Sequence, residues 1–177
     1  MGKMAPSRLL AAGSAGLVGC WFYLLGVGHI CLAFRPAGDV FAFILMAAFI
    51  AVMVGYGVAH TAYFAIGAGA QTARKAGLDM EEGGRLGNAL FGRLSVITYL
   101  PVVVSSLMMI YAVVAGRSLY PVWMVIFLPV VIYLLKRPVI WLLRGHIREL
   151  VNDSYDNIAF LAYFLISTIV LWNAVVV

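Results

Sequence analysis

The sequence predicts an all-α, polytopic membrane protein, and three observations lead to this fold class. Of the 177 residues, 64% are apolar and 11% are charged, and the mean hydropathy is +1.03. A soluble domain usually carries about a quarter charged residues. The apolar residues are gathered into five long stretches, and the basic residues lie mostly in alternate connections between them. We therefore expect a single transmembrane domain over residues 1–177, built as a bundle of about five spanning helices.

Each of the five apolar stretches is long enough to cross a bilayer. A spanning α-helix needs about 20 residues to cross about 30 Å of hydrocarbon. Unpaired backbone polar groups are too costly in lipid for an open, irregular chain. The alternating segments of about ten residues that mark an outer-membrane barrel are absent from the sequence. The predicted spans are 9–34, 40–70, 87–115, 119–143 and 155–177, with cytoplasmic-side loops at 71–86 and 144–154.

The distribution of basic residues predicts the orientation. With five crossings, ten of the 12 Lys and Arg residues fall on one side, and only Arg35 and Arg117 fall on the other. The positive-inside rule makes the richer side cytoplasmic, or the equivalent side of an organelle. The N-terminus is then inside and the C-terminus outside, in a bacterial inner membrane or an organelle membrane. Nucleic acid is not an expected partner, because the basic residues are not clustered on a soluble domain.

Glycine and proline give the local expectations along the chain. Small residues in the first span form a strip that favours close helix packing, namely Ala12, Gly13, Ala15, Gly16 and Gly19. Gly77 is expected to end a helix, and Gly83 with Gly84 to form a second short turn. Pro101 is expected to kink the third span.

Two histidines inside the predicted spans are the centre of the candidate binding site. His29 lies in the first span and His60 in the second. Ionisable groups at membrane depth are costly and are often functional. On a helix, Tyr56, His60 and Tyr63 share one face with Phe64, a patch suited to a flat lipophilic ligand or a proton. The predicted ligand-binding residues are His60, Tyr56, Tyr63 and His29, and no catalytic residue is predicted.

The chemistries open to these residues are haem ligation, acid–base catalysis on a sterol-like or isoprenoid substrate, and ion or proton conduction. At about 1.5 Å per residue, the depths of His29 and His60 differ by roughly 10–20 Å, which disfavours one shared haem. No Asp or Glu lies in the interior of a predicted span, although acid–base work and proton transport normally use one. A neutral histidine that fixes helix packing is the favoured interpretation. No cofactor is predicted, and lipid and haem are the candidate ligands.

The other metal and thiol candidates are weak. His146 and Glu149 share a helical face that, with Asp153, resembles part of a metal site, but a zinc site normally needs more Cys or His ligands. A solvated interfacial helix is the favoured interpretation, and no metal is predicted. Cys20 and Cys31 are expected to be apolar thiols without a disulfide.

Several short strings resemble an uncharacterised family of multipass membrane proteins from bacteria and microbial eukaryotes. The resemblance covers most of the chain after about residue 20 and rests, with Pro129, on Phe22-Tyr-Leu-Leu-Gly-Val-Gly-His, Phe34-Arg-Pro-Ala-Gly, Ala59-His-Thr-Ala-Tyr-Phe, Tyr120-Pro-Val-Trp and Leu171-Trp-Asn. The family has no agreed activity. The resemblance implies that His29, His60, Tyr120, Pro121 and Asn173 matter as a set, for the fold if not for an activity.

Three classes of function are compatible with these features. The favoured class is a non-enzymatic accessory or structural subunit of a membrane assembly, or a homo-oligomer, whose partners are the lipid bilayer and other membrane subunits or itself. The second is a binder or enzyme for a lipophilic small molecule, such as a lipid, a sterol or haem, beside His60. The third is a small channel or transporter with Pro101 and Pro129 as hinges.

Overall fold

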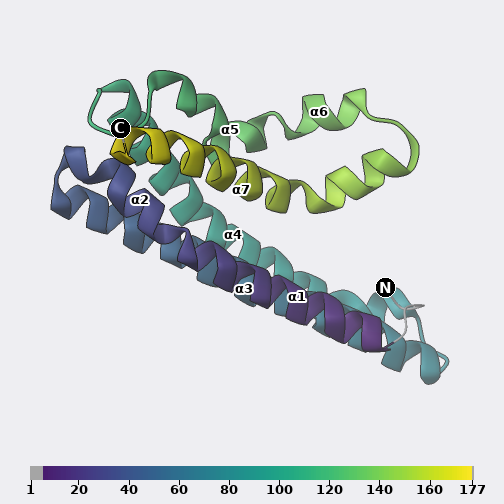
Figure 1. Ribbon diagram of the computed structural model, residues 1–177. Coiled ribbons are helices and arrows are strands. Elements are labelled where there is room, and N and C mark those ends of the chain that lie inside the picture. Colours follow the sequence, from purple (N-terminus) through teal and green to yellow (C-terminus); the bar gives the residue numbers. More distant parts are fainter. Residues whose placement is uncertain (1–5, 177) are drawn as a thin grey trace. The chain divides into compact units, whose positions relative to one another are not determined.

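The computed structural model describes residues 6–176, which are almost entirely helical and contain no strand (Figure 1). The helices are α1 (Pro6–Leu25), α2 (Val27–Phe34), α3 (Asp39–Lys75), α4 (Met80–Val114), α5 (Pro129–Leu134), α6 (Lys136–Leu142) and α7 (Gly145–Val176), with 3-10 segments η1 (Arg35–Ala37) and η2 (Val122–Phe127). Two compact units are formed. The first comprises the chain up to Leu25 with Phe49–Pro101, and the second comprises Gly26–Ala48 with the chain from Val102 onward. The predicted all-α class is confirmed.

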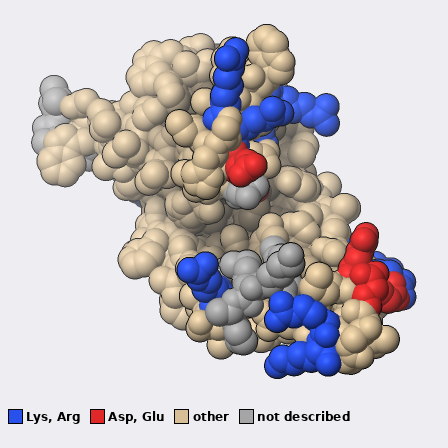
Figure 2. Space-filling view, turned by 90° about the vertical axis from the view of Figure 1, so that its right-hand side faces the viewer, with Lys and Arg blue, Asp and Glu red and all other residues tan. Residues whose placement is uncertain are grey.

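Four helical segments within the described residues are long and apolar enough to cross a membrane, as expected for a membrane protein. They are Ser7–Ala37, Asp39–Lys75, Met80–Val114 and Ser154–Ala174. Only 28% to 39% of the most apolar window of each segment is buried. In the face shown in Figure 2, most surface atoms belong to uncharged residues, and the charged side chains form a few separate groups. The apolar faces of the long helices are therefore largely uncovered by the protein itself.

The predicted span 119–143 is not a single helix, so a fifth continuous spanning helix is not found among the described residues. This stretch is divided into η2, α5 and α6, with an extended backbone at Leu128 (ψ 140°) and Leu143 (ψ 153°). Pro121 precedes η2, Pro129 opens α5 and Pro138 lies in α6. Proline lacks a backbone N–H and clashes with the preceding turn. Three prolines within 18 residues therefore interrupt the helix that hydropathy alone suggested.

The first unit is held together by glycines at which two helices approach closely. A Cβ atom at Gly16 of α1 would overlap the His60 side chain of α3. A Cβ atom at Gly83 of α4 would lie 2.6 Å from the carbonyl oxygen of Gly69 in α3. Gly13 approaches the Phe64 side chain, 3.7 Å from the position of a Cβ atom. Helix α3 therefore contacts α1 on one side and α4 on the other through glycine.

Part of the predicted strip on the first helix makes these contacts. Gly13 and Gly16 face α3, whereas Gly19 has no neighbour within 4 Å of a Cβ position and Ala15 is exposed. The side chain of Ala12 lies outside the described part of the chain. The strip is therefore narrower than the sequence suggested, and its contact surface is confined to one turn of α1.

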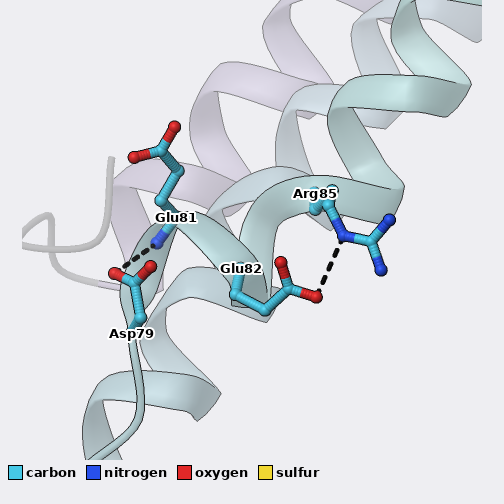
Figure 3. Close-up of polar contacts among 4 residues, drawn as sticks. All are labelled: Asp79, Glu81, Glu82 and Arg85. Carbon is cyan, nitrogen blue, oxygen red and sulfur yellow. Dashed lines mark hydrogen bonds and ion pairs between the residues drawn. The ribbon is translucent and has the colours of Figure 1, made fainter.

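The connection between α3 and α4 is shorter than the predicted polar loop. Helix α3 continues to Lys75, and Gly77 ends it with a φ of 71°, as predicted. The prediction of a second turn at Gly83 and Gly84 is wrong, because both residues lie within α4. Asp79 starts that helix by accepting a hydrogen bond from the Glu81 N–H at 3.1 Å (Figure 3). An acidic side chain stabilises a helix N-terminus, so α4 begins before the two glycines.

Candidate functional site

His60 is half-buried on α3, and its ring lies against the backbone of α1. Gly16 is the residue that makes room for it, because any side chain there would overlap the imidazole. The space beside His60 on this side is therefore filled by the neighbouring helix. Small residues commonly allow such close contacts where two membrane helices meet.

The second side of His60 continues into a row of aromatic rings. The ring centroids of His60 and Tyr63 are 5.8 Å apart, and those of Tyr63 and Phe91 are 4.8 Å apart. Phe91 belongs to α4, so the row joins α3 to α4 within the first unit. Ring pairs at these separations contribute about 0.5–1.5 kcal/mol beyond the burial of their surface. Of the predicted face, the structure thus brings His60 and Tyr63 together.

Of the other predicted residues, Tyr56 lies on the same helix as His60 and His29 lies in the other unit. Tyr56 is half-buried one turn earlier on α3. His29 belongs to the second unit, where its Nδ1 atom lies 3.4 Å from the hydroxyl oxygen of Thr168 on α7. That hydroxyl also donates a hydrogen bond to the Phe164 carbonyl at 2.8 Å. His29 is therefore engaged at a helix contact of its own.

A buried cluster of hydroxyl groups in the second unit was not predicted. The Tyr120 hydroxyl lies 2.5 Å from that of Ser167 and 3.2 Å from that of Tyr163. Tyr163 and Ser167 are fully buried, and Tyr120 is 4% exposed. The Phe34 ring packs edge-on against Tyr120, with centroids 5.4 Å apart. We call Tyr120, Tyr163 and Ser167 the hydroxyl cluster.

The hydroxyl cluster joins segments that lie far apart in the sequence. Tyr120 precedes η2 and lies outside the four long apolar helices. The sequence signal was the spacing of Tyr163 and Ser167, which puts both on one face of α7. Their partner lies more than 40 residues away, and no spacing rule connects it to them.

A second tyrosine supports the interrupted stretch. The Tyr155 hydroxyl of α7 donates a hydrogen bond to the Ile132 carbonyl at 2.9 Å, where α5 is about to end. The ammonium group of Lys136 lies 5.6 Å from the centre of the Tyr155 ring, a cation–π contact. Tyr155 therefore satisfies backbone at a helix break, which is what a broken helix needs away from water.

Two cavities are walled mainly by apolar side chains. One, of about 260 Å³, lies between α1 and α3 in the first unit and is lined on α3 by residues that include Gly57 and Thr61. The other, of about 820 Å³, runs along α2 and the start of α3 in the second unit. Both are lined by a cysteine, Cys20 and Cys31 respectively, and these thiols are free, as predicted.

Among the described residues, no group of three His, Cys, Asp or Glu side chains is placed to hold a metal ion. The exposed pair His146 and Glu149 lies 3.9 Å apart on the first turns of α7. The third member of that suggested site, the Asp153 side chain, lies outside the described part of the chain.

Comparison with known protein families shows which family the chain belongs to. A family model described as "Family of unknown function (DUF6796)" matches residues 1–174. The chain belongs to this family. It matches none of the curated proteins and none of the solved structures with which it was compared. Membership of DUF6796 agrees with the resemblance to an uncharacterised family, whose taxonomic range stays a prediction. The resemblance singled out five residues of this DUF6796 member. His60 lies in the first unit, and the other four lie in the second, namely His29, Tyr120, Pro121 and Asn173.

Proposed function

We propose that this protein is a non-catalytic integral membrane protein, acting as an accessory or structural subunit of a membrane assembly or as a homo-oligomer. The observation that carries the proposal is the use made of its buried polar groups. Every described buried side-chain nitrogen or oxygen has a hydrogen-bond partner within the protein. A catalytic site instead directs polar groups at an open space where substrate can lie.

The hydroxyl groups of the long helices illustrate this use. Thr98 donates to the Leu94 carbonyl at 2.8 Å, and Ser105 donates to the Val102 carbonyl at 3.1 Å. Both bonds return to the backbone of the same helix, as hydroxyls in membrane helices commonly do. The polar groups thereby leave the outer faces apolar, which suits contact with lipid or with another helix.

Association is supported by how little of each helix the chain covers. With 28% to 39% of each apolar window buried, most helix faces remain available to a further subunit or a second copy. Membrane helices associate through van der Waals packing of such faces. We place the protein in a bacterial inner membrane or an organelle membrane, with lipid and membrane subunits as partners and without nucleic acid.

The test is the mass of the protein released from its membrane. Native mass spectrometry after extraction in a gentle detergent, and again in a polymer that carries the native lipid along, should give a species heavier than the 19.2 kDa chain. A species at multiples of that mass supports a homo-oligomer, and one with a second protein supports an accessory subunit. A monomer without partner in both media would contradict the proposal.

We further propose that the chain crosses the membrane five times, with the interrupted stretch 119–143 as the fourth crossing and the N-terminus inside. Two contacts support a full traverse beside α7 (Figure 1). The Leu119 N–H donates to the Ala33 carbonyl at 2.7 Å, near the end of the first apolar segment. At its other end, Lys136 lies over Tyr155, near the start of the last one. A broken helix is tolerated at membrane depth where protein covers it.

The basic residues support the same topology. If the interrupted stretch did not cross, Lys136, Arg137, Arg144 and Arg148 would share a side with Arg35 and Arg117. The 12 basic residues would then divide equally, six on each side, without the bias that the positive-inside rule describes. Single cysteines at Ala76, Arg117 and Arg144, in a chain with Cys20→Ala and Cys31→Ala, allow labelling with an impermeant maleimide. We expect Ala76→Cys and Arg144→Cys to react from one side and Arg117→Cys from the other. Arg117→Cys and Arg144→Cys reacting from the same side would exclude the fourth crossing.

A binder of a lipophilic small molecule is the second candidate, favoured by the cavity of about 260 Å³ between α1 and α3, which is lined by Thr61, the residue next to His60 in the sequence. Volumes of roughly 300–1,000 Å³ are usual for ligand sites, so this cavity suits a small or partly inserted ligand. Extraction of the purified protein with organic solvent, followed by mass spectrometry, should then yield a small molecule that a Thr61→Leu variant lacks. Identical extracts from both proteins would remove this candidate.

A further inference from the structure

The larger groove lies at the hairpin between α2 and α3, within the second unit. It measures about 820 Å³ and is open along one side. Its walls are Gly28, Cys31 and Leu32 from α2 and Val40, Phe43 and Met46 from α3. Val40 is 75% exposed and Phe43 is 63% exposed, and a Cβ atom at Gly28 would have no neighbour within 4 Å. The groove is therefore apolar, and the protein leaves it uncovered.

A pair of opposite charges closes one end of this groove. The Nε atom of Arg35 lies 3.1 Å from Oδ1 of Asp39, and the two side chains are 70% and 82% exposed. A guanidinium has five N–H donors and a carboxylate has two acceptor oxygens, so this single bond uses only part of either group. The remaining donors and acceptors are available to a ligand that carries both charges.

The charged pair and the apolar groove also lie at different levels. Arg35 lies near the end of one apolar segment and Asp39 opens the next, so in the membrane topology proposed above the pair lies where the chain leaves the hydrocarbon region. The groove residues follow along both helices from that point. A charged pair at the membrane interface matches a phospholipid headgroup, and the apolar groove below it matches an acyl chain.

We propose that this groove binds a phospholipid with a zwitterionic, primary-amine headgroup, of the phosphatidylethanolamine class. Arg35 donates to the lipid phosphate, for which a guanidinium is well shaped, and Asp39 accepts hydrogen bonds from the ammonium group. One acyl chain lies along the groove against Leu32 and Phe43. An anionic lipid would place no cation beside Asp39, and a quaternary ammonium has no N–H to donate to it. Because Arg35 and Asp39 carry opposite charges, the pair favours a headgroup that has both a phosphate and a primary ammonium group.

The direct test is lipid retention in nanodiscs made from equal parts phosphatidylethanolamine, phosphatidylcholine and phosphatidylglycerol. Native mass spectrometry should show the wild-type protein retaining about ten molecules of phosphatidylethanolamine for each molecule of either other lipid, the scale of one charge-assisted hydrogen bond. Arg35→Ala should abolish the enrichment. Asp39→Asn leaves a net positive pair and should shift the preference to phosphatidylglycerol. Retention of the three lipids in the supplied ratio by the wild type would overturn the proposal.

Matched variants separate the groove from general effects. Gly28→Leu should fill the groove without changing a charge and abolish the enrichment, whereas Gly92→Leu should retain it. Gly92 is an equally open helical glycine, with no neighbour within 4 Å of a Cβ position. Arg117→Ala is the corresponding control for Arg35→Ala, because it also removes an exposed basic residue. Equal losses in a groove variant and its control would count against the site.

The free thiol of Cys31 provides a second readout that needs no retained lipid. Cys31 is half-buried in the groove, whereas Cys20 is buried elsewhere. A small maleimide should label Cys31 several-fold more slowly in phosphatidylethanolamine nanodiscs than in phosphatidylglycerol nanodiscs. The Asp39→Asn variant should reverse this order. Labelling rates that are the same with both headgroups, in the wild type and in Asp39→Asn, would overturn the proposal. Neither lipid retention nor Cys31 labelling depends on the oligomeric state proposed above.

Discussion

The close glycine contacts of the molecule are concentrated in the first unit, whereas the buried hydroxyl contacts between separate segments are found in the second. In the first, glycines bring backbones into contact, as where Gly69 of α3 meets Gly83 of α4. In the second, buried hydroxyls connect separate segments, as where Tyr120 meets Ser167 of α7. A glycine contact has no room for an added atom, whereas a hydroxyl contact can lose one bond and keep its shape. The first unit should therefore be far less tolerant of substitution than the second.

The largest effect is expected at the contact of α3 and α4. Gly83→Leu places a side chain 2.5 Å from the Ala73 Cβ atom and against the Gly69 backbone, neither of which can move alone. We expect a loss of about 3 kcal/mol or more in the free energy of unfolding, measured in mixed micelles. Gly92→Leu on the same helix should be neutral or stabilising by up to about 1 kcal/mol. Similar losses in the two variants would remove the special role of Gly83.

A smaller loss is expected at the contact of α1 and α3. Gly16→Leu overlaps the His60 ring, but a side chain can rotate away more easily than a backbone can shift. We expect a loss of about 1–3 kcal/mol, with Gly19→Leu as the control, because Gly19 is open on its side of α1. Should Gly19→Leu prove the more damaging change, the assignment of faces on α1 would be wrong.

Loss of one hydroxyl in the second unit should cost less again. Tyr120→Phe leaves Ser167 and Tyr163 buried with one partner fewer, which we expect to cost about 1–2 kcal/mol. A double-mutant cycle with Ser167→Ala should show a coupling of about 1 kcal/mol. Tyr111→Phe, at a tyrosine 56% exposed, should have no measurable effect. Full additivity of Tyr120→Phe and Ser167→Ala would show that their contact contributes nothing.

The smallest effect is expected where α7 supports the interrupted stretch. Tyr155→Phe removes one of two donors to the Ile132 carbonyl, the other being the Leu135 N–H at 3.0 Å. We expect a loss of about 0.5–1 kcal/mol in the free energy of global unfolding. Hydrogen exchange should become faster only in α5 and α6. If hydrogen exchange in α5 and α6 were unchanged in Tyr155→Phe, Tyr155 would not support these helices. If it were equally fast in Tyr120→Phe, the effect would not be local to Tyr155.

What the sequence could predict was the part of the fold that periodicity and composition determine. The apolar helices, the helix end at Gly77 and the free thiols all follow from local chemistry. The interruption of 119–143 was signalled by its prolines but outweighed by its hydropathy. Gly83 and Gly84 were misread as a turn because a glycine pair is typical of both turns and helix contacts. The spacing of Gly83 and Gly87, a small-xxx-small motif, was the signal that favours the contact.

The candidate site was predicted less well, for a physical reason. Sequence placed His60 and Tyr63 on one helical face, and the structure brings these two together. It had no means to show that Gly16 of another helix fills the space beside His60, or that Tyr120 reaches Ser167. Such contacts depend on how helices are set against one another, which no local pattern encodes.

The central claim is that the polar side chains inside these helices serve packing, and His60 is the residue on which it is tested most directly. Unfolding of the double variant Gly16→Leu/His60→Ala should be compared with that of each single variant. If the imidazole serves to fill the space at Gly16, its removal makes room for the leucine, and the double variant should recover most of the stability lost in Gly16→Leu. No recovery in the double variant, together with a bound molecule lost in His60→Ala alone, would contradict the claim and make His60 a ligand-binding residue.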